Sequence, residues 1–187
     1  MTPACATRSR TRGFTLIELM VTLAVVVIIT VVAIPSLRTF VQNVRRDSVV
    51  DGLVASLHYT RNQALSLNQT TMLCAGTPGL SCTGGTWGGG WEVLSLPAGA
   101  TTVALASHPL VSASTLPTLK ALNSSTSFSF NGQGLVTNMP AAGNETIVVC
   151  DARGASYARA VFINSVGYIQ ASPNPGSAPN GTALTCP

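Results

Sequence analysis

The chain has 187 residues, of which 46% are hydrophobic and only 9% are charged. This length fits one ordinary domain with an appendage, and the composition excludes a disordered protein and a site built from clustered carboxylates. Three arginines lie within the first twelve residues, whereas seven basic and six acidic residues are spread over the chain from residue 14 onward. The basic charge therefore belongs to the N-terminus and does not indicate general nucleic-acid binding.

Residues 14–34 form an apolar segment, FTLIELMVTLAVVVIITVVAI, in which Glu18 is the one charged residue. About 20 apolar residues are enough to span a bilayer. The arginines before the segment place the N-terminus in the cytoplasm, so everything after residue 35 is expected on the far side of the membrane. A secretory signal carries its small-residue cleavage site after the apolar region. Here the small residue, Gly13, comes first, so cleavage at Gly13 would leave the apolar helix in the mature protein.

The string Gly13–Leu19, GFTLIEL, resembles the class III signal of type IV prepilins and pseudopilins. The resemblance implies that a prepilin peptidase cleaves between Gly13 and Phe14 and N-methylates Phe14. A carboxylate inside the hydrocarbon costs ~2.5–3.5 kcal/mol, so Glu18 needs a partner or access to the interface. The resemblance implies that Glu18 pairs with the N-terminal amine of a neighbouring subunit during filament assembly. The alternatives are a plain single-pass anchor and an interfacial charge without a role.

Pro35 follows the apolar segment and predicts a kink in a helix that continues beyond it. Apolar residues then recur at spacings of three and four, as in an amphipathic helix. One helix is therefore expected over about 14–67, with its second half packed against a domain. The residues expected on the packed face are Leu37, Phe40, Val41, Val44, Leu53, Leu57, Ala64 and Leu65.

From residue 70 the composition changes to Thr, Ser, Gly, Val and aromatic residues, which is typical of strands and turns. A long helix followed by short strands predicts an α+β fold, in which the helix packs against an antiparallel β-sheet. The strands are expected at 70–75, 90–96, 101–106, 127–131, 145–150, 159–164 and 167–171. The expected organisation is a cleaved leader (1–13), a transmembrane helix (14–34), its amphipathic continuation (35–67) and a β-rich periplasmic domain (68–187).

Five cysteines are present, and Cys5 lies in the expected leader. The other four would meet an oxidising compartment, where three pairings are possible. Cys74 and Cys82 flank a turn-rich loop, and Cys186 is next to last in a tail that otherwise has nothing to hold it. We therefore favour Cys74 with Cys82 and Cys150 with Cys186 over a zinc site.

The remaining motifs indicate no chemistry. The glycine-rich run 84–91 lacks the Gly-Lys-Ser/Thr of a phosphate loop, and the chain contains no G-x-S-x-G and no C-x-x-C. His58 and His108 are isolated from each other and from the cysteines. We expect no catalytic residue, no metal and no cofactor, so the protein is not expected to be an enzyme.

The chain beyond the helix resembles the GspH/FimT group, which comprises minor pilins of type IV pili and the H-type pseudopilin of type II secretion. The resemblance implies a structural subunit that joins or primes a filament. It also implies these partners: the prepilin peptidase, other minor pilins or pseudopilins, the major pilin and an inner-membrane assembly platform. The residues that carry it are Arg61-Asn62-Gln63-Ala64, Asn68, Met72-Leu73-Cys74, Trp87, Gly90-Trp91, Phe128-Ser129-Phe130, Gly132, Gly134 and Val148-Val149-Cys150-Asp151.

The alternative is a DNA-binding minor pilin of natural transformation. In such members of the group a Gly-Arg-x-Arg element contacts phosphates, whereas the matching turn here reads Gly167-Tyr168-Ile169-Gln170. Arg153 and Arg159 flank the preceding turn and are the remaining candidates for DNA contact. We therefore expect a structural subunit without nucleic acid, and the paired cysteines and tryptophans favour a type IV pilus over type II secretion.

Overall fold

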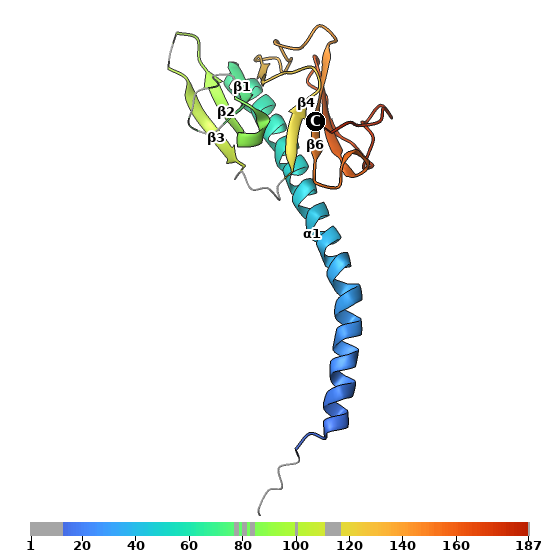
Figure 1. The fold of residues 1–187 in the computed structure, drawn as a ribbon. Helices are drawn as coiled ribbons and strands as arrows, with labels where there is room; N and C mark the ends of the chain where they lie inside the picture. The colour runs from blue at the N-terminus through green and yellow to red at the C-terminus, as the bar shows by residue number, and fades with distance from the viewer. Residues whose placement is uncertain are drawn as a thin grey trace, which may run out of the picture. The chain divides into compact units, whose positions relative to one another are not determined.

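The computed structural model describes residues 13–76, 79, 82, 85–99, 101–110 and 117–186. It divides after Val41 into two compact units. Helix α1 (Leu16–Leu67) contributes to both units, and all the strands belong to the second, as Figure 1 shows. One long helix followed by antiparallel sheets confirms the predicted α+β fold.

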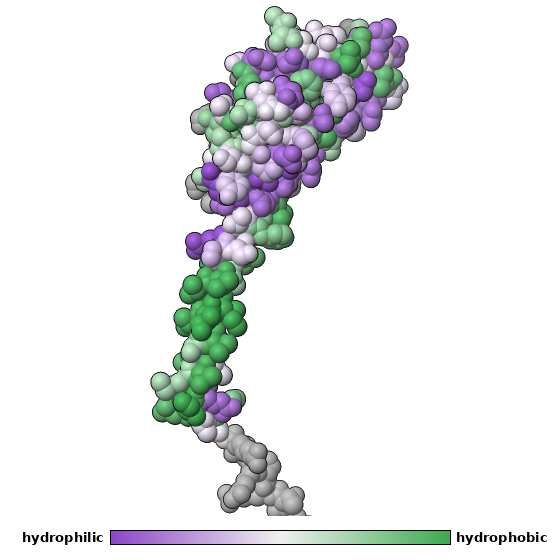
Figure 2. Space-filling view, turned by 90° about the vertical axis from the view of Figure 1, so that its right-hand side faces the viewer, coloured by the Kyte–Doolittle hydropathy of each residue, from purple (hydrophilic) through white to green (hydrophobic). Residues whose placement is uncertain are grey.

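The first unit contains the N-terminal part of α1. Its helix continues through Pro35, as predicted, although a proline removes one backbone hydrogen bond from a helix. Within the described residues, α1 is the one helix that is long and apolar enough to cross a membrane. Figure 2 shows this apolar surface as a continuous hydrophobic band over the helix.

The second unit holds two four-stranded antiparallel sheets. The first sheet has the strand order β3-β2-β1-β5, with β1 at Thr70–Ala75, β2 at Gly90–Leu96, β3 at Val103–Pro109 and β5 at Ser127–Phe130. The second has the order β4-β6-β7-β8, with β4 at Thr118–Ala121, β6 at Asn144–Cys150, β7 at Arg159–Asn164 and β8 at Ile169–Ala171. Short 3₁₀ turns, η1 (Trp87–Gly89) and η2 (Ala155–Tyr157), precede β2 and β7.

The seven predicted strands all match observed ones: three have the predicted bounds, two (127–131 and 145–150) differ by one residue at one end, and two differ by more. The strand expected at 101–106 runs over Val103–Pro109, and the one expected at 167–171 begins only at Ile169. Strand β4 was not predicted, because only Leu119 and Ala121 of its four residues point inward. It forms by pairing with β6, about 30 residues further along the chain.

The packed face of α1 begins later than predicted. Leu37 and Phe40 are 62% and 63% exposed, and Val41, Val44 and Leu65 are also exposed. The sheets cover the helix only from Arg46 onward, so apolar spacing before that point does not mean burial. The residues of α1 that are buried are Arg46, Val49, Val50, Leu53, Leu57, Thr60 and Ala64.

The main core lies where α1 meets the inner faces of both sheets and includes Trp91, Phe128 and Ile147. A second apolar cluster lies on the other face of β6, where Val148 and Cys150 contact Ala178 and Leu184 of the C-terminal tail. Strand β6 is therefore buried on both faces, which explains its unbroken apolar run.

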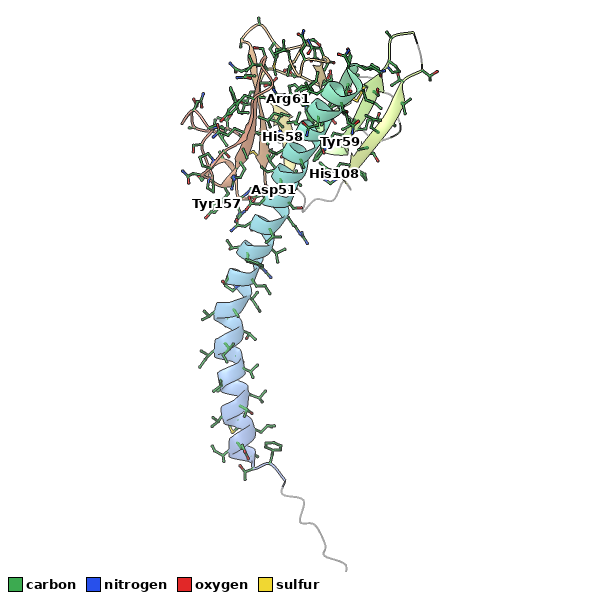
Figure 3. The ribbon with its side chains drawn as sticks, turned by 180° about the vertical axis from the view of Figure 1, so that it is seen from behind. Asp51, His58, Tyr59, Arg61, His108 and Tyr157 are labelled. Carbon is green, nitrogen blue, oxygen red and sulfur yellow. A yellow bond between two sulfur atoms is a disulfide. The ribbon has the colours of Figure 1, made fainter. Side chains whose placement is uncertain are left out.

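A glycine inside α1 allows β3 to approach the helix closely. A Cβ atom at Gly52 would lie 2.9 Å from Nε2 of His108, and the His108 ring packs against Trp91 with 4.4 Å between the ring centroids. Figure 3 shows His108 beside this part of the helix. The close approach of His108 explains the glycine at position 52, although a glycine inside a helix lowers its stability by about 1 kcal/mol relative to alanine.

Candidate functional site

The residues of the predicted processing signal lie at the start of α1. Phe14 is 82% exposed, and apart from the chain neighbours of Gly13 no atom of the described residues lies within 4 Å of the position that a Cβ of Gly13 would take. Both residues precede Leu16, the first residue of the helix. The peptide bond between Gly13 and Phe14 is therefore outside regular structure, as a protease requires of its substrate.

Glu18 forms a capping box with Thr15. Its backbone N–H donates to Thr15 Oγ1 at 3.2 Å, and Thr15 N–H donates to Glu18 Oε2 at 3.5 Å. This reciprocal arrangement satisfies backbone donors that the first turn of a helix leaves without partners. This role was not predicted from the sequence, although the T-x-x-E pattern of Thr15 and Glu18 is its signature.

The surface that follows Glu18 is apolar over several turns. Leu19, Val27, Ile29 and Val32 are each more than half exposed. No residue of this stretch is buried within the described chain. Such a surface is stable only when lipid or other apolar helices cover it.

The structure contains the two favoured disulfides, Cys74–Cys82 and Cys150–Cys186. The second encloses a sequence separation of 36 residues and ties the C-terminal tail to the end of β6. Closing a loop of this length stabilises a fold by ~4 kcal/mol in the loop-entropy model.

The two arginines considered for DNA contact are paired with aspartates. Arg153 forms a salt bridge with Asp151, and its guanidinium lies 4.3 Å from the centre of the Tyr157 ring. Arg159 lies 3.6 Å from Asp47. The side chains of Arg153 and Arg159 are only 14% and 20% exposed. Both are therefore engaged within the domain rather than presented to a ligand.

This pairing controls the ionisation of Asp151. Burial disfavours its charged form, but hydrogen bonds from the side chain and backbone of Arg153, with the charges of Arg153 and Arg46, outweigh that effect and lower the pKa of Asp151 below 3.8. The hydrogen bonds that the Arg153 side chain donates to Asp151 raise the pKa of Arg153, although burial opposes this effect. Both groups are charged at neutral pH and hold the turn between β6 and β7.

Two arginines of α1 that the sequence analysis did not assign attach the helix to the sheets. Arg46, 3% exposed, donates to the carbonyl oxygen of Tyr157 at 2.7 Å. Arg61 donates to the carbonyl oxygen of Gly134 at 3.1 Å and to that of Val166 at 3.4 Å. Because the acceptors are backbone atoms distant in sequence, no pattern of residue types predicts them.

The turn that corresponds to the Gly-Arg-x-Arg element has a different chemistry. Gly167 adopts a φ of +76°, and Tyr168 Oη donates to Gln170 Oε1 at 3.1 Å. Tyr168 is 51% exposed. The exposed part of this turn is aromatic and uncharged, which offers no charge partner to a phosphate.

One group of side chains in the described part of the chain has the composition of a metal site. It consists of Cys74, Cys82 and Glu92, whose ligand atoms lie within 4.8 Å of one another. The two cysteines are joined as a disulfide in this structure.

Family models match both parts of the chain. The model of the prokaryotic N-terminal methylation motif matches residues 8–34, and the model of the type II transport protein GspH matches residues 49–167. An exposed apolar helix with this motif, followed by antiparallel sheets, defines a membrane-anchored structural subunit of the minor pilin or pseudopilin class. The chain belongs to the GspH family.

Two crystal structures of the type IV minor pilin FimU from Pseudomonas aeruginosa (strain PAO1) have a similar fold. One is 25% identical to this chain with a TM-score of 0.55, and the alignment covers 72% of this chain and 92% of the FimU chain. The other, in a different crystal form, is 23% identical with a TM-score of 0.52, and the alignment covers 68% of this chain and 92% of the FimU chain. No curated protein matches the chain significantly. Nothing in these findings favours the DNA-binding alternative.

Proposed function

We propose that this chain is a minor subunit of a type IV pilus, which is incorporated into the filament or primes its assembly. Before assembly it is anchored in the inner membrane, with the N-terminus in the cytoplasm and the β-rich domain in the periplasm. The observation that carries this proposal is the methylation motif at residues 8–34 on a helix whose apolar surface is uncovered within the chain.

The processing step follows from the same signal. A prepilin peptidase cleaves between Gly13 and Phe14 and methylates the new amine of Phe14. The exposed, non-helical position of both residues supports access by such an enzyme. Cleavage leaves Phe14 as the first residue, four positions before Glu18.

In the filament, Glu18 pairs with the N-terminal amine of a neighbouring subunit. The other partners are further minor pilins, the major pilin and the inner-membrane assembly platform. The low density of charge on α1 before Arg38 supports this role, because an unpaired carboxylate is costly among apolar helices. The likeness to FimU favours a type IV pilus, whereas the description of the matching family model names type II transport.

The experiment that tests this function follows the chain from membrane to filament. Pili are sheared from cells that express the chain with and without a prepilin peptidase, and the chain is identified by intact mass. We expect a methylated chain that begins at Phe14, present in the filaments at a low ratio to the major pilin. Deletion of the gene should reduce surface pili and leave type II secretion unchanged.

The Gly13→Val variant serves as the control, because a bulky residue before the cleaved bond should leave the chain unprocessed in the membrane. A mature chain that begins beyond residue 30 would contradict a pilin. Loss of secretion with normal pili would instead assign the chain to a pseudopilus.

A further inference from the structure

Strand β2 buries a carboxylate directly opposite a disulfide. Glu92 is only 4% exposed, and it is the register partner of Cys74 in the β1–β2 pair. Residues directly opposite each other in an antiparallel pair place their side chains on the same face of the sheet. The carboxylate of Glu92 thus lies beside the Cys74–Cys82 sulfurs.

This buried carboxylate is incompletely compensated. Glu92 Oε2 accepts one hydrogen bond, from the backbone N–H of Gly79 at 2.9 Å, while Oε1 has no hydrogen-bond partner among the residues that the structure describes. The salt bridges in the described part of the chain do not involve Glu92. A buried polar oxygen without a hydrogen-bond donor is costly, and a disulfide offers it no donor.

The other buried glutamate of the sheets shows the contrast. Glu145 is fully buried in β6, and its two carboxylate oxygens accept three backbone hydrogen bonds, from Asn123, Ser125 and Thr146. Its position is explained by the turn that it holds. In Glu92, by contrast, only one of the two carboxylate oxygens has a hydrogen-bond donor among the described residues.

The cluster brings together the ligand types that a zinc-type divalent cation prefers. Thiolates bind Zn²⁺ at about 2.3 Å and carboxylates at about 2.0–2.2 Å, in tetrahedral sites. Ligand atoms around such an ion are therefore roughly 3.5–4 Å apart. The sulfur atoms of Cys74 and Cys82 and an oxygen of Glu92 lie within 4.8 Å of one another, so small side-chain movements would bring them to one ion.

We propose that Cys74, Cys82 and Glu92 bind a zinc-type divalent cation when the Cys74–Cys82 disulfide is reduced. A dithiol reductant supplies two electrons that break the S–S bond, and its two protons pass to the cysteine sulfurs as it becomes a disulfide. Binding of the ion then displaces those two protons and leaves two thiolates and one carboxylate as ligands, with water in the fourth position. A disulfide oxidant reverses the sequence: it accepts two electrons from the two thiolates and two protons from solvent and becomes a dithiol, the Cys74–Cys82 bond forms again and the ion leaves.

The site therefore has two exclusive states, a disulfide and a metal-bound dithiolate. Either state ties Cys82 to the end of β1. Glu92 is a ligand in the reduced state and holds the Gly79 amide in the oxidised one. This inference does not depend on the filament to which the subunit belongs.

The test uses the full chain in detergent micelles, with Cys5→Ser, Cys150→Ser and Cys186→Ser so that only one cysteine pair remains. Zn²⁺ is titrated against a chromophoric chelator with and without a phosphine reductant, and Co²⁺ absorption reports thiolate ligands. The reduced chain should bind one equivalent of Zn²⁺ and the oxidised chain none. Cys74→Ser should abolish binding, and Glu92→Gln should weaken it at least about tenfold, since even outer-shell changes cost 10–100-fold.

The matched control is Glu145→Gln, which alters a buried strand glutamate away from the cysteines and should leave Zn²⁺ affinity unchanged. The proposal is overturned by no stoichiometric binding to the reduced chain, by equal binding to the oxidised chain, or by equal affinities of Glu92→Gln and its parent. If Glu92→Gln does not fold, the Glu92→Asp variant is tested in its place. A changed Co²⁺ spectrum then supports the site, and an unchanged one overturns it.

Discussion

At the residue scale, the single carboxylate of Glu18 has two roles, one within its own chain and one in the proposed filament. Within the chain it caps the first turn of α1 together with Thr15. In the proposed filament it pairs with the amine of another subunit. These roles are separable because a glutamine keeps an oxygen that accepts a hydrogen bond but lacks the charge.

We predict that Glu18→Val and Glu18→Gln both insert into the membrane and both lower the amount of the subunit in sheared filaments about tenfold or more, because removal of a charge strands its buried partner. Quantitative mass spectrometry of membrane and filament fractions measures this. Thr15→Ala, which removes the cap but keeps the charge, is the matched control and should assemble. Normal assembly of Glu18→Gln would show that capping is the role of Glu18.

A second residue-scale device is the Asp151–Arg153 pair beside the β6–β7 turn. Because the pKa of Asp151 is lowered in the folded domain, its ionised form stabilises the fold at pH values above 3.8. That stabilisation is lost as the pH falls through the lower pKa of the folded state. The direction of the effect follows from Arg153, which favours the charged carboxylate.

Asp151→Asn should therefore destabilise the domain by about 1.5–3 kcal/mol at neutral pH, because it leaves the Arg153 charge without its partner. The difference from the parent should shrink as the pH falls below 3.8 and through the lowered pKa of Asp151 in the folded state. Thermal unfolding of the full chain over this pH range measures it. The exposed Asp51 on α1 provides the control, and an equal loss at all pH values in Asp151→Asn would contradict an electrostatic role.

At the element scale, α1 is attached to the sheets at two levels that are 15 residues apart. Arg46 bonds to the chain before β7, and Arg61 bonds to the turns that hold Gly134 and Val166. At 1.5 Å per residue the two levels are ~22 Å apart along the helix. The attachments therefore fix both ends of the packed part of α1.

Arg61→Ala should destabilise the domain by about 2 kcal/mol, because two backbone carbonyls lose a charged donor. Arg61→Lys should recover less than half of that loss, since one ammonium does not reproduce the fork of a guanidinium. Thermal unfolding measures both variants. The control is Arg45→Ala, because Arg45 is exposed. Equal stabilities of Arg61→Lys and the parent would contradict a role of the Arg61 guanidinium in bridging the helix to the two turns.

At the scale of the whole molecule, the small excess of basic residues and the pairing of two arginines agree with a structural subunit rather than a DNA-binding one. The chain beyond residue 38 holds only a small excess of basic residues. Two of these, Arg153 and Arg159, are paired with Asp151 and Asp47. Binding to several phosphates requires a denser basic face.

We predict that the purified full chain binds duplex DNA weakly, without the steep salt dependence of a protein that neutralises many phosphates. Gel-shift titration at low and moderate salt measures this. A variant with Tyr168→Arg and Gln170→Arg, which restores the missing pair of arginines, should bind more tightly. Tight, salt-sensitive binding by the parent that is lost on Arg153→Ala and Arg159→Ala would make DNA capture the function.

Several features of this chain were predictable because their signals are local. The processing motif, the apolar helix and most strands each depend on a short stretch whose period or composition is visible. The favoured disulfides also followed from a turn-rich loop and a long tail. The capping role of Glu18 was readable in the same way, from the T-x-x-E pattern.

Other features are set only by the tertiary structure, because they join residues that are far apart in sequence. Arg61 bonds to carbonyls 73 and 105 positions away, and β4 exists only through its pairing with β6. The sequence by itself determined the class of fold and the membrane helix. Packing decided where on α1 burial begins, which arginines are neutralised and which carboxylate is left beside a disulfide, since each depends on what a distant strand places next to it.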